Sequence, residues 1–323
     1  MDNNDNRTII EDENTITDNE TANGEGAVSA GMGVAEAINE ANSLTGAGDY
    51  GSAKDRLEET IAKLEADDVY NDENGDVIYF AFAEPMENIL FNLRNQPDKP
   101  IVQAPEPFAS LYFTYGKLLL GMKDFDGALA ALKKAIRWNP VNPNIAFQLA
   151  DVYRAQEKYE DFAAETKKIF PNAYTSPYLA RAYRNMGYYF VEKEMWKEAM
   201  GCYLMSMEYD PESSDATKEI KYIQEKSAGS AGVPRIDEFK SVAGEHDIPV
   251  GPDQEIVGIA VSYGRQAFDD GRKDVAHYFL VMAYDLTNDD NIKKMADEIE
   301  AEDIKAGEAL KDETQQDTDD IDD

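Results

Sequence analysis

Small and apolar residues recur along the chain at spacings that predict pairs of helices. Near the start of five amphipathic segments stands an apolar residue, namely Ala53, Ala128, Phe162, Ala199 and Ala276. Twelve positions before each of them, a preceding helical segment carries a small residue, namely Ala41, Gly116, Ala150, Gly187 and Gly264. Two helices approach closely only where side chains are small, so the fixed offset predicts one helical hairpin used five times.

The hairpin that contains Gly116 shows a fuller pattern. Tyr112-x-x-Tyr115-Gly116-x-x-Leu119 is followed by Ala128-x-x-x-Leu132-x-x-Ala135 and then by Pro140. Residues 183–211 repeat this pattern, with Ser206 in place of one small residue. With these spacings the chain resembles a tetratricopeptide repeat protein over roughly half of its length.

The resemblance implies an all-α fold. Proteins of this family form a right-handed superhelix of antiparallel helix pairs, whose first helices line a concave groove. We expect this superhelix over residues 33–305, with repeats near 34–67, 109–142, 143–176, 180–213 and 257–290. The family implies the binding of a protein or peptide partner and no chemistry of its own.

Two insertions, 68–108 and 214–256, do not follow the hairpin pattern. In the first, two β-prone stretches flank the pair Asn74-Gly75, which predicts a small β-hairpin. In the second, residues 227–234 are rich in Ser, Ala and Gly, which predicts a flexible linker before the last repeat.

Acidic residues dominate the chain and gather at its ends. The formal net charge is −34; residues 1–32 hold eight acidic residues and one basic residue, and residues 297–323 hold thirteen and two. Residues 1–32 and 306–323 have few bulky apolar residues, so we expect two disordered acidic ends. Such a surface repels phosphate backbones and anionic lipids, which argues against nucleic acid and membranes as partners. Because the first residues lack a basic and apolar secretion signal, we expect a cytoplasmic location.

The two acidic ends are expected to be dispensable for folding, since they lack apolar residues that could join a core. Removal of residues 1–32 and 306–323 should change the free energy of unfolding by less than ~1 kcal/mol. Denaturation followed by circular dichroism measures this change. A marked loss of helical signal on truncation would show that the ends are packed parts of the fold.

Residue types that commonly carry chemistry are sparse. Cys202 is the one cysteine, and with His246 and His277 it gives too few soft ligands for a structural zinc site. Cys202 lies among apolar residues and is expected in the core. Residues 46–51, Gly-Ala-Gly-Asp-Tyr-Gly, spell a dinucleotide-binding motif, but a helix instead of a strand precedes them, which favours a turn between helices. We predict no metal, no cofactor and no enzymatic activity.

The concave groove implied by the family is the candidate peptide-binding site. If the family's helix phase is carried over, ten residues face this groove: Phe113, Lys117, Phe147, Gln148, Asp151, Arg154, Arg181, Arg184, Asn185 and Tyr188. Arg181, Arg184 and Tyr188 lie three and four positions apart, so helical spacing independently places them on one face. An arginine can donate two hydrogen bonds to one carboxylate, and aromatic rings supply large contact areas. These residues therefore predict a clamp for an acidic peptide with an apolar anchor.

Alternatives to this clamp remain open from the sequence. The arginines can instead join neighbouring repeats, through pairs such as Arg184 with Asp151 and Arg154 with Glu192. The repeats can also form a regulatory subunit that binds and inhibits an enzyme or a transcription factor, in place of a scaffold or adaptor. The acidic residues 317–323 have the features of the expected ligand, so they either occupy the groove or only keep the protein soluble.

Overall fold

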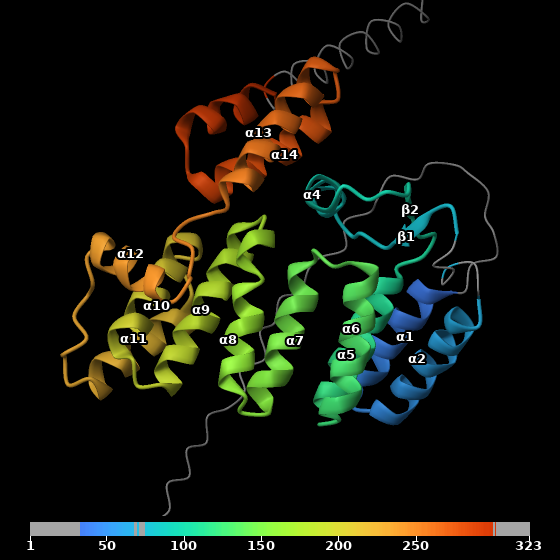
Figure 1. Ribbon diagram of the computed structural model, residues 1–323, viewed down its shortest axis with the longest axis horizontal. Coiled ribbons are helices and arrows are strands. Elements are labelled where there is room, and N and C mark those ends of the chain that lie inside the picture. The colour runs from blue at the N-terminus through green and yellow to red at the C-terminus, as the bar shows by residue number, and fades with distance from the viewer. Residues whose placement is uncertain (1–32, 68–69, 71–74, 300, 302–323) are drawn as a thin grey trace, which may run out of the picture. The chain divides into compact units, whose positions relative to one another are not determined.

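The computed structural model describes residues 33–67, 70, 75–299 and 301, and helices make up most of this part of the chain (Figure 1). The helices are α1 (Val34–Gly46), α2 (Tyr50–Glu65), α4 (Pro85–Asn95), α5 (Phe108–Gly121), α6 (Phe125–Trp138), α7 (Pro143–Ala155), α8 (Tyr159–Lys167), α9 (Ser176–Glu192), α10 (Trp196–Tyr209), α11 (Ser214–Lys226), α12 (Ile236–Glu245), α13 (Gln254–Asp269) and α14 (Lys273–Thr287). A 3₁₀ turn η1 (Phe170–Asn172) follows α8, and residues 290–299 are also helical. The predicted all-α fold is confirmed.

Within the described residues, the five predicted hairpins are present as the packed helix pairs α1–α2, α5–α6, α7–α8, α9–α10 and α13–α14 (Figure 1). All ten residues predicted at the helix crossings are buried. The approach is close, because a Cβ at Gly116 would lie only 2.7 Å from Cγ of Leu132, and one at Gly264 only 2.8 Å from Cγ of Leu280. Burial and close approach agree with the hairpin register predicted from the twelve-residue offset.

The five turns within these pairs share one backbone geometry. The residue before the N-cap of each second helix has a positive φ: Gly48 (82°), Lys123 (62°), Glu157 (58°), Glu194 (57°) and Gly271 (75°). In each turn the N-cap amide then donates to a carbonyl five residues earlier, as Met195 does to Phe190 at 2.9 Å. At residues 46–51 this geometry confirms a turn between helices and no strand. The same turn, used five times, supports a repeated structural unit.

The first insertion contains a small sheet, but it is not the predicted β-hairpin. Strand β1 (Ile78–Phe80) pairs with β2 (Ile101–Gln103), and the two strands are parallel. Parallel strands need a crossover connection, and α4 provides it. The Asn74-Gly75 signal was misleading because a local turn signal does not specify the partner of the strand that follows. Residues 71–74 lie outside the described residues.

A buried carboxylate fixes this insertion to the repeats. Glu87 on α4 is fully buried, and its Oε2 accepts from the Ala83 and Glu84 amides at 2.8 and 3.1 Å. The Nδ2 groups of Asn139 and Asn142, which end α6 and cap α7, each donate to this carboxylate at 2.7 Å. The Tyr174 hydroxyl donates to Oε1 at 3.1 Å. One side chain therefore ties α4 to both inter-repeat turns that follow it in the chain.

The last helix pair also contacts the insertion. Arg94 on α4 donates from Nε to Oε2 of Glu255 on α13 at 2.7 Å, and from Nη1 to the Pro171 carbonyl at 2.7 Å. The Tyr278 hydroxyl on α14 lies 3.1 Å from Oε2 of Glu84. Residues 227–234, predicted as a flexible linker, begin with a hydrogen-bonded turn, and Ala231 is buried against the core. The expected disordered ends lie outside the described residues.

Candidate functional site

Helices α7 and α9 position most of the predicted site residues. Asn142 caps α7 by accepting from the Ile145 amide at 3.2 Å, and Pro143 opens the helix. Pro177 lies in the first turn of α9, where a residue without an amide hydrogen costs no helical hydrogen bond. These starts set the phase that turns Asp151 and Arg154 of α7 toward α9.

Asp151 joins the two helices. Its Oδ2 accepts from Nη2 of Arg181 at 2.8 Å, and its Oδ1 lies 3.1 Å from Nη2 of Arg154. The second contact is an ion pair without hydrogen-bond geometry, because Oδ1 has no aligned donor among the described residues. Two guanidinium groups therefore share one carboxylate.

Aromatic rings lie against the same two arginines. The guanidinium of Arg181 lies 4.4 Å from the ring centre of Phe147, and that of Arg154 lies 5.6 Å from the ring centre of Tyr188. Both distances are within the range of cation–π attraction. Tyr188 also contacts the ring of Phe162 on α8 edge to face, with centroids 5.9 Å apart.

Arg184 has a different partner from the one considered in the sequence. Its Nη1 donates to Oδ2 of Asp210, the residue that follows α10, at 2.8 Å. The predicted ion pair between Arg184 and Asp151 is therefore wrong, because Arg181 forms the ion pair with Asp151. The general alternative, ion pairs between neighbouring helices, is present in the structure.

Two predicted groove residues do not reach an open surface. Phe147 is fully buried, since Arg181 covers its ring and it packs into the core cluster of α9. Asn185 is buried against α8, where its Nδ2 lies 3.4 Å from Oγ1 of Thr166. The structure thus corrects the exposure expected for both, because α9 turns position 185 toward α8. Gln148 is half-buried.

Residues 119–186 match the family model for the tetratricopeptide repeat. This segment runs from the end of α5 to the middle of α9 and contains most of the candidate site. Within this segment the chain is similar to the tetratricopeptide repeat. No curated protein matches the chain.

Several solved structures are similar in helix arrangement to this chain. A structure from the functional characterization of Pseudomonas aeruginosa pilF is 12% identical over 84% of this chain and 97% of that chain, with a TM-score of 0.44. YrrB, described as a TPR protein with an unusual peptide-binding site, is 17% identical over 67% and 100%, with a TM-score of 0.33. A TPR repeats protein from Bacteroides fragilis is 15% identical over 83% and 98%, with a TM-score of 0.29. At these TM-scores the structural similarity is loose.

The second repeat contributes less to the site than the sequence suggested. Phe113 on α5 is half-buried against the core of the first two helix pairs. Lys117, one turn later, is exposed, and no described acidic residue pairs with it. The structure therefore brings together Asp151, Arg154, Arg181 and Tyr188 by direct contact, whereas Lys117 stands apart.

Residues that commonly carry chemistry are few in the described part of the chain. Cys202 is buried, as predicted, and burial raises the pKa of its thiol. No described group of three or more His, Cys, Asp or Glu side chains is arranged to hold a metal ion. Among the described helices none is both long and apolar enough to cross a membrane.

Sequence reasoning missed the buried Glu87. A signal was present, because Glu87 lies between Met86 and Leu90 on the apolar stripe of α4. A charged residue on such a stripe needs buried partners, and its side-chain partners come from residues more than fifty positions away. No local sequence pattern identifies these partners.

Proposed function

We propose that this chain is a non-enzymatic scaffold or adaptor that binds a peptide segment of another protein along the first helices of its middle repeats. The observation that carries the proposal is the set of three arginines on α7 and α9 that have spare hydrogen-bonding capacity. Among the described residues, Arg181 and Arg184 each donate one hydrogen bond, although a guanidinium has five N–H groups. Their remaining donors are available to a ligand.

Charge supports an acidic ligand at this face. Within the described residues, Arg154, Arg181 and Arg184 pair with two carboxylates, Asp151 and Asp210, which leaves one positive charge without a described partner. The three arginine side chains keep between 19% and 33% of their surface exposed, which leaves them accessible to a partner. A guanidinium group can donate two parallel hydrogen bonds to one carboxylate, so an acidic peptide is the ligand class that fits best.

The net charge of the chain bears on the class of partner and on the location of the protein. A net charge of −34 opposes binding to nucleic acid and to anionic membranes, so we propose a protein partner in the cytoplasm. Within this picture the acidic residues 317–323 remain candidates for a competing ligand. They lie outside the described residues.

Selection of a random peptide display library on the full chain tests this proposal. The wild type should enrich acidic peptides that carry an apolar residue. Their affinity should fall about tenfold or more in an Arg181→Ala/Arg184→Ala variant, because a hydrogen bond to a charged group contributes ~1.5–3 kcal/mol. The matched control, Lys123→Ala/Lys133→Ala, removes two exposed lysines that have no described partner. Equal losses in both variants, or enriched peptides without acidic residues, would reject the proposed site.

A further inference from the structure

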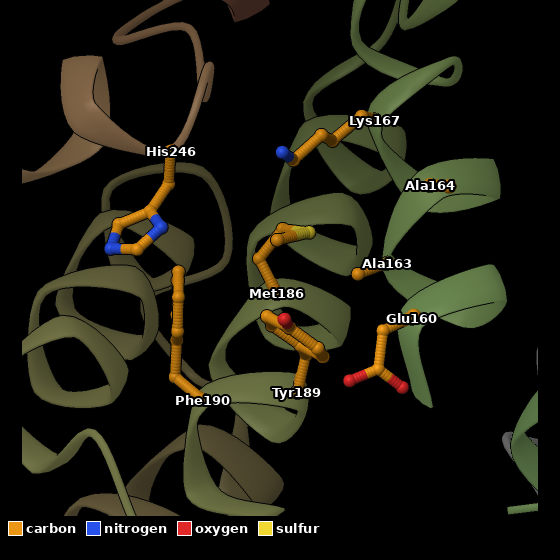
Figure 2. Close-up of a pocket in the computed structure, with 8 residues that line it drawn as sticks. All are labelled: Glu160, Ala163, Ala164, Lys167, Met186, Tyr189, Phe190 and His246. Atoms are coloured by element: carbon orange, nitrogen blue, oxygen red, sulfur yellow. The ribbon is translucent and has the colours of Figure 1, made fainter. Parts of the chain in front are cut away.

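A pocket lies between α8, α9 and the end of α12, with a volume of about 310 Å³ (Figure 2). Its accessible apolar surface comes from the exposed Ala164 and the half-buried ring of Tyr189, above a floor of the buried side chains Ala163, Met186 and Phe190. Its polar rim includes Lys167 on α8 and His246, the residue that follows α12. Figure 2 shows Lys167 extending from α8 toward the side of the pocket where His246 lies.

This pocket does not belong to the proposed peptide groove. At roughly 100° per residue, Met186, Tyr189 and Phe190 lie about 80–180° around α9 from Arg181. The pocket also uses the second helix of a repeat and the inserted α12, neither of which supplies a residue to the proposed groove. It is therefore a separate surface, and its occupancy does not depend on the proposed function.

Lys167 is unusual among the basic residues. Within the described residues, every other lysine or arginine that is partly buried has an ion pair, a hydrogen bond or another charge or ring contact. Lys167 is partly buried and has none. In a chain of net charge −34, an ammonium group at a pocket rim without an acidic partner is unexpected.

The acidic residue of the pocket does not neutralise Lys167. Glu160 forms an ion pair with Lys193, the residue that follows α9. Figure 2 places the Glu160 carboxylate at the opposite end of the pocket from the Lys167 ammonium. The Lys167 end of the pocket therefore has no described carboxylate beside it.

His246 adds a second polar group at the Lys167 end. Its ring meets Phe190 edge to face, with centroids 4.8 Å apart, and its nitrogens have no described hydrogen-bond partner. One face of the pocket is thus apolar, and the adjoining rim offers an ammonium and an imidazole. A ligand that satisfies both surfaces must combine an apolar group with a neighbouring negative charge.

We propose that this pocket is a second peptide-binding site, which takes one large apolar side chain of a partner protein while a carboxylate within two residues of it binds Lys167 and His246. The volume is at the lower end of ligand pockets, about 300–1,000 Å³, which suits a peptide side chain better than a large cofactor. Charge complementarity selects the acidic neighbour, since a buried apolar anchor gives affinity and a charge pair gives orientation.

The test compares peptides selected by display on the full chain with two charge-reversal variants. Lys167→Glu removes the proposed contact. Lys168→Glu is the matched control, because Lys168 is the next residue and pairs with Glu165 at 2.6 Å, outside the pocket. Ala164→Glu serves as a second pocket variant, since Ala164 is exposed at the pocket and its replacement leaves the core intact. Circular dichroism confirms that each variant is folded.

We expect a class of peptides in which a large apolar residue lies within two positions of Asp or Glu. Their affinity should fall about tenfold in Lys167→Glu and in Ala164→Glu, and stay within about twofold in Lys168→Glu and in Arg181→Ala/Arg184→Ala. The last comparison separates failure of this site from failure of the proposed groove. If no selected peptide distinguishes Lys167→Glu from Lys168→Glu, the pocket is not a peptide site.

Two other occupants are tested in parallel. A synthetic peptide of residues 312–323 is titrated into chain truncated at residue 311, and sedimentation measures self-association of the full chain. Binding of that peptide, abolished by Lys167→Glu, would assign the pocket to the chain's own end. A dimer abolished by the same change would assign it to a second copy. Either result would overturn the assignment to a partner protein.

Discussion

Replacement of Gly187 by leucine is expected to lower the free energy of unfolding by about 3 kcal/mol, the upper range for overpacking a close contact. A Cβ at Gly187 would lie 2.7 Å from Cε2 and 2.8 Å from Cδ2 of Tyr203. The Tyr203 ring is only 3% exposed, so it has no space into which it can move. The added side chain must therefore force α9 and α10 apart. Urea denaturation followed by circular dichroism measures the loss.

Gly258→Leu is the matched control for this change. Gly258 is also a helical glycine, on α13, but it is exposed and no atom lies within 4 Å of a Cβ built there. Leucine has the higher helix propensity, so stability should stay the same or rise by up to ~1 kcal/mol. Equal stability of Gly187→Leu and Gly258→Leu would mean that the two helices of the fourth repeat do not cross at Gly187.

Replacement of Glu87 by leucine is expected to cost about 3–5 kcal/mol, because several buried donors lose their common acceptor and each unsatisfied donor costs ~1–3 kcal/mol. The change leaves the buried amides of Asn139 and Asn142, the Tyr174 hydroxyl and two backbone amides without their acceptor. Each unsatisfied buried donor adds to the cost. The same denaturation experiment measures the effect. Glu208→Leu, at an exposed site on α10, is the control and should change stability by less than ~0.5 kcal/mol.

The pH dependence of stability identifies the charge state of Glu87. Burial raises the pKa of Glu87 above its ordinary value of 4.5, although hydrogen bonds from Asn139, Tyr174 and the Ala83 and Glu84 amides oppose this rise. Between 4.5 and the raised pKa the native state binds more protons than the unfolded state, so the contribution of Glu87 to stability falls as the pH increases. Glu87→Gln lacks this titration. The stability advantage of the wild type over Glu87→Gln should therefore narrow as the pH rises through this window, and an advantage that widens would contradict the raised pKa.

The repeated part of the fold could be predicted because its determinants are local. Gly187 and Ala199 lie twelve positions apart in one hairpin, and the turn between them depends on neighbouring backbone atoms. The β-hairpin predicted for the first insertion was wrong because its contacts join residues far apart in the sequence. Strand β1 finds its partner at Ile101–Gln103, and Glu87 finds its donors on α6, on the cap of α7 and after η1. Long-range pairing of this kind leaves no periodic trace in the sequence.

For the candidate site too, local features could be predicted and long-range packing could not. Helical spacing predicted that Arg181 and Arg184 share a face, and in the structure each of them pairs with a carboxylate. It did not reveal that Phe147 and Asn185 are buried, because burial depends on how α9 is rotated against α7 and α8. The pocket at Lys167 could not be foreseen, since α12, which contributes His246 at its end, lies outside the repeats.

The most direct test of the account is a calorimetric titration of a display-selected acidic peptide into the full chain. The peptide should bind the wild type and the Lys123→Ala/Lys133→Ala control alike, with affinity that weakens as salt is added, since the contact is electrostatic. Binding should be at least about tenfold weaker in Arg181→Ala/Arg184→Ala. Affinity that is unchanged in the arginine variant, in a protein that is still folded, would contradict peptide binding at the α7–α9 face.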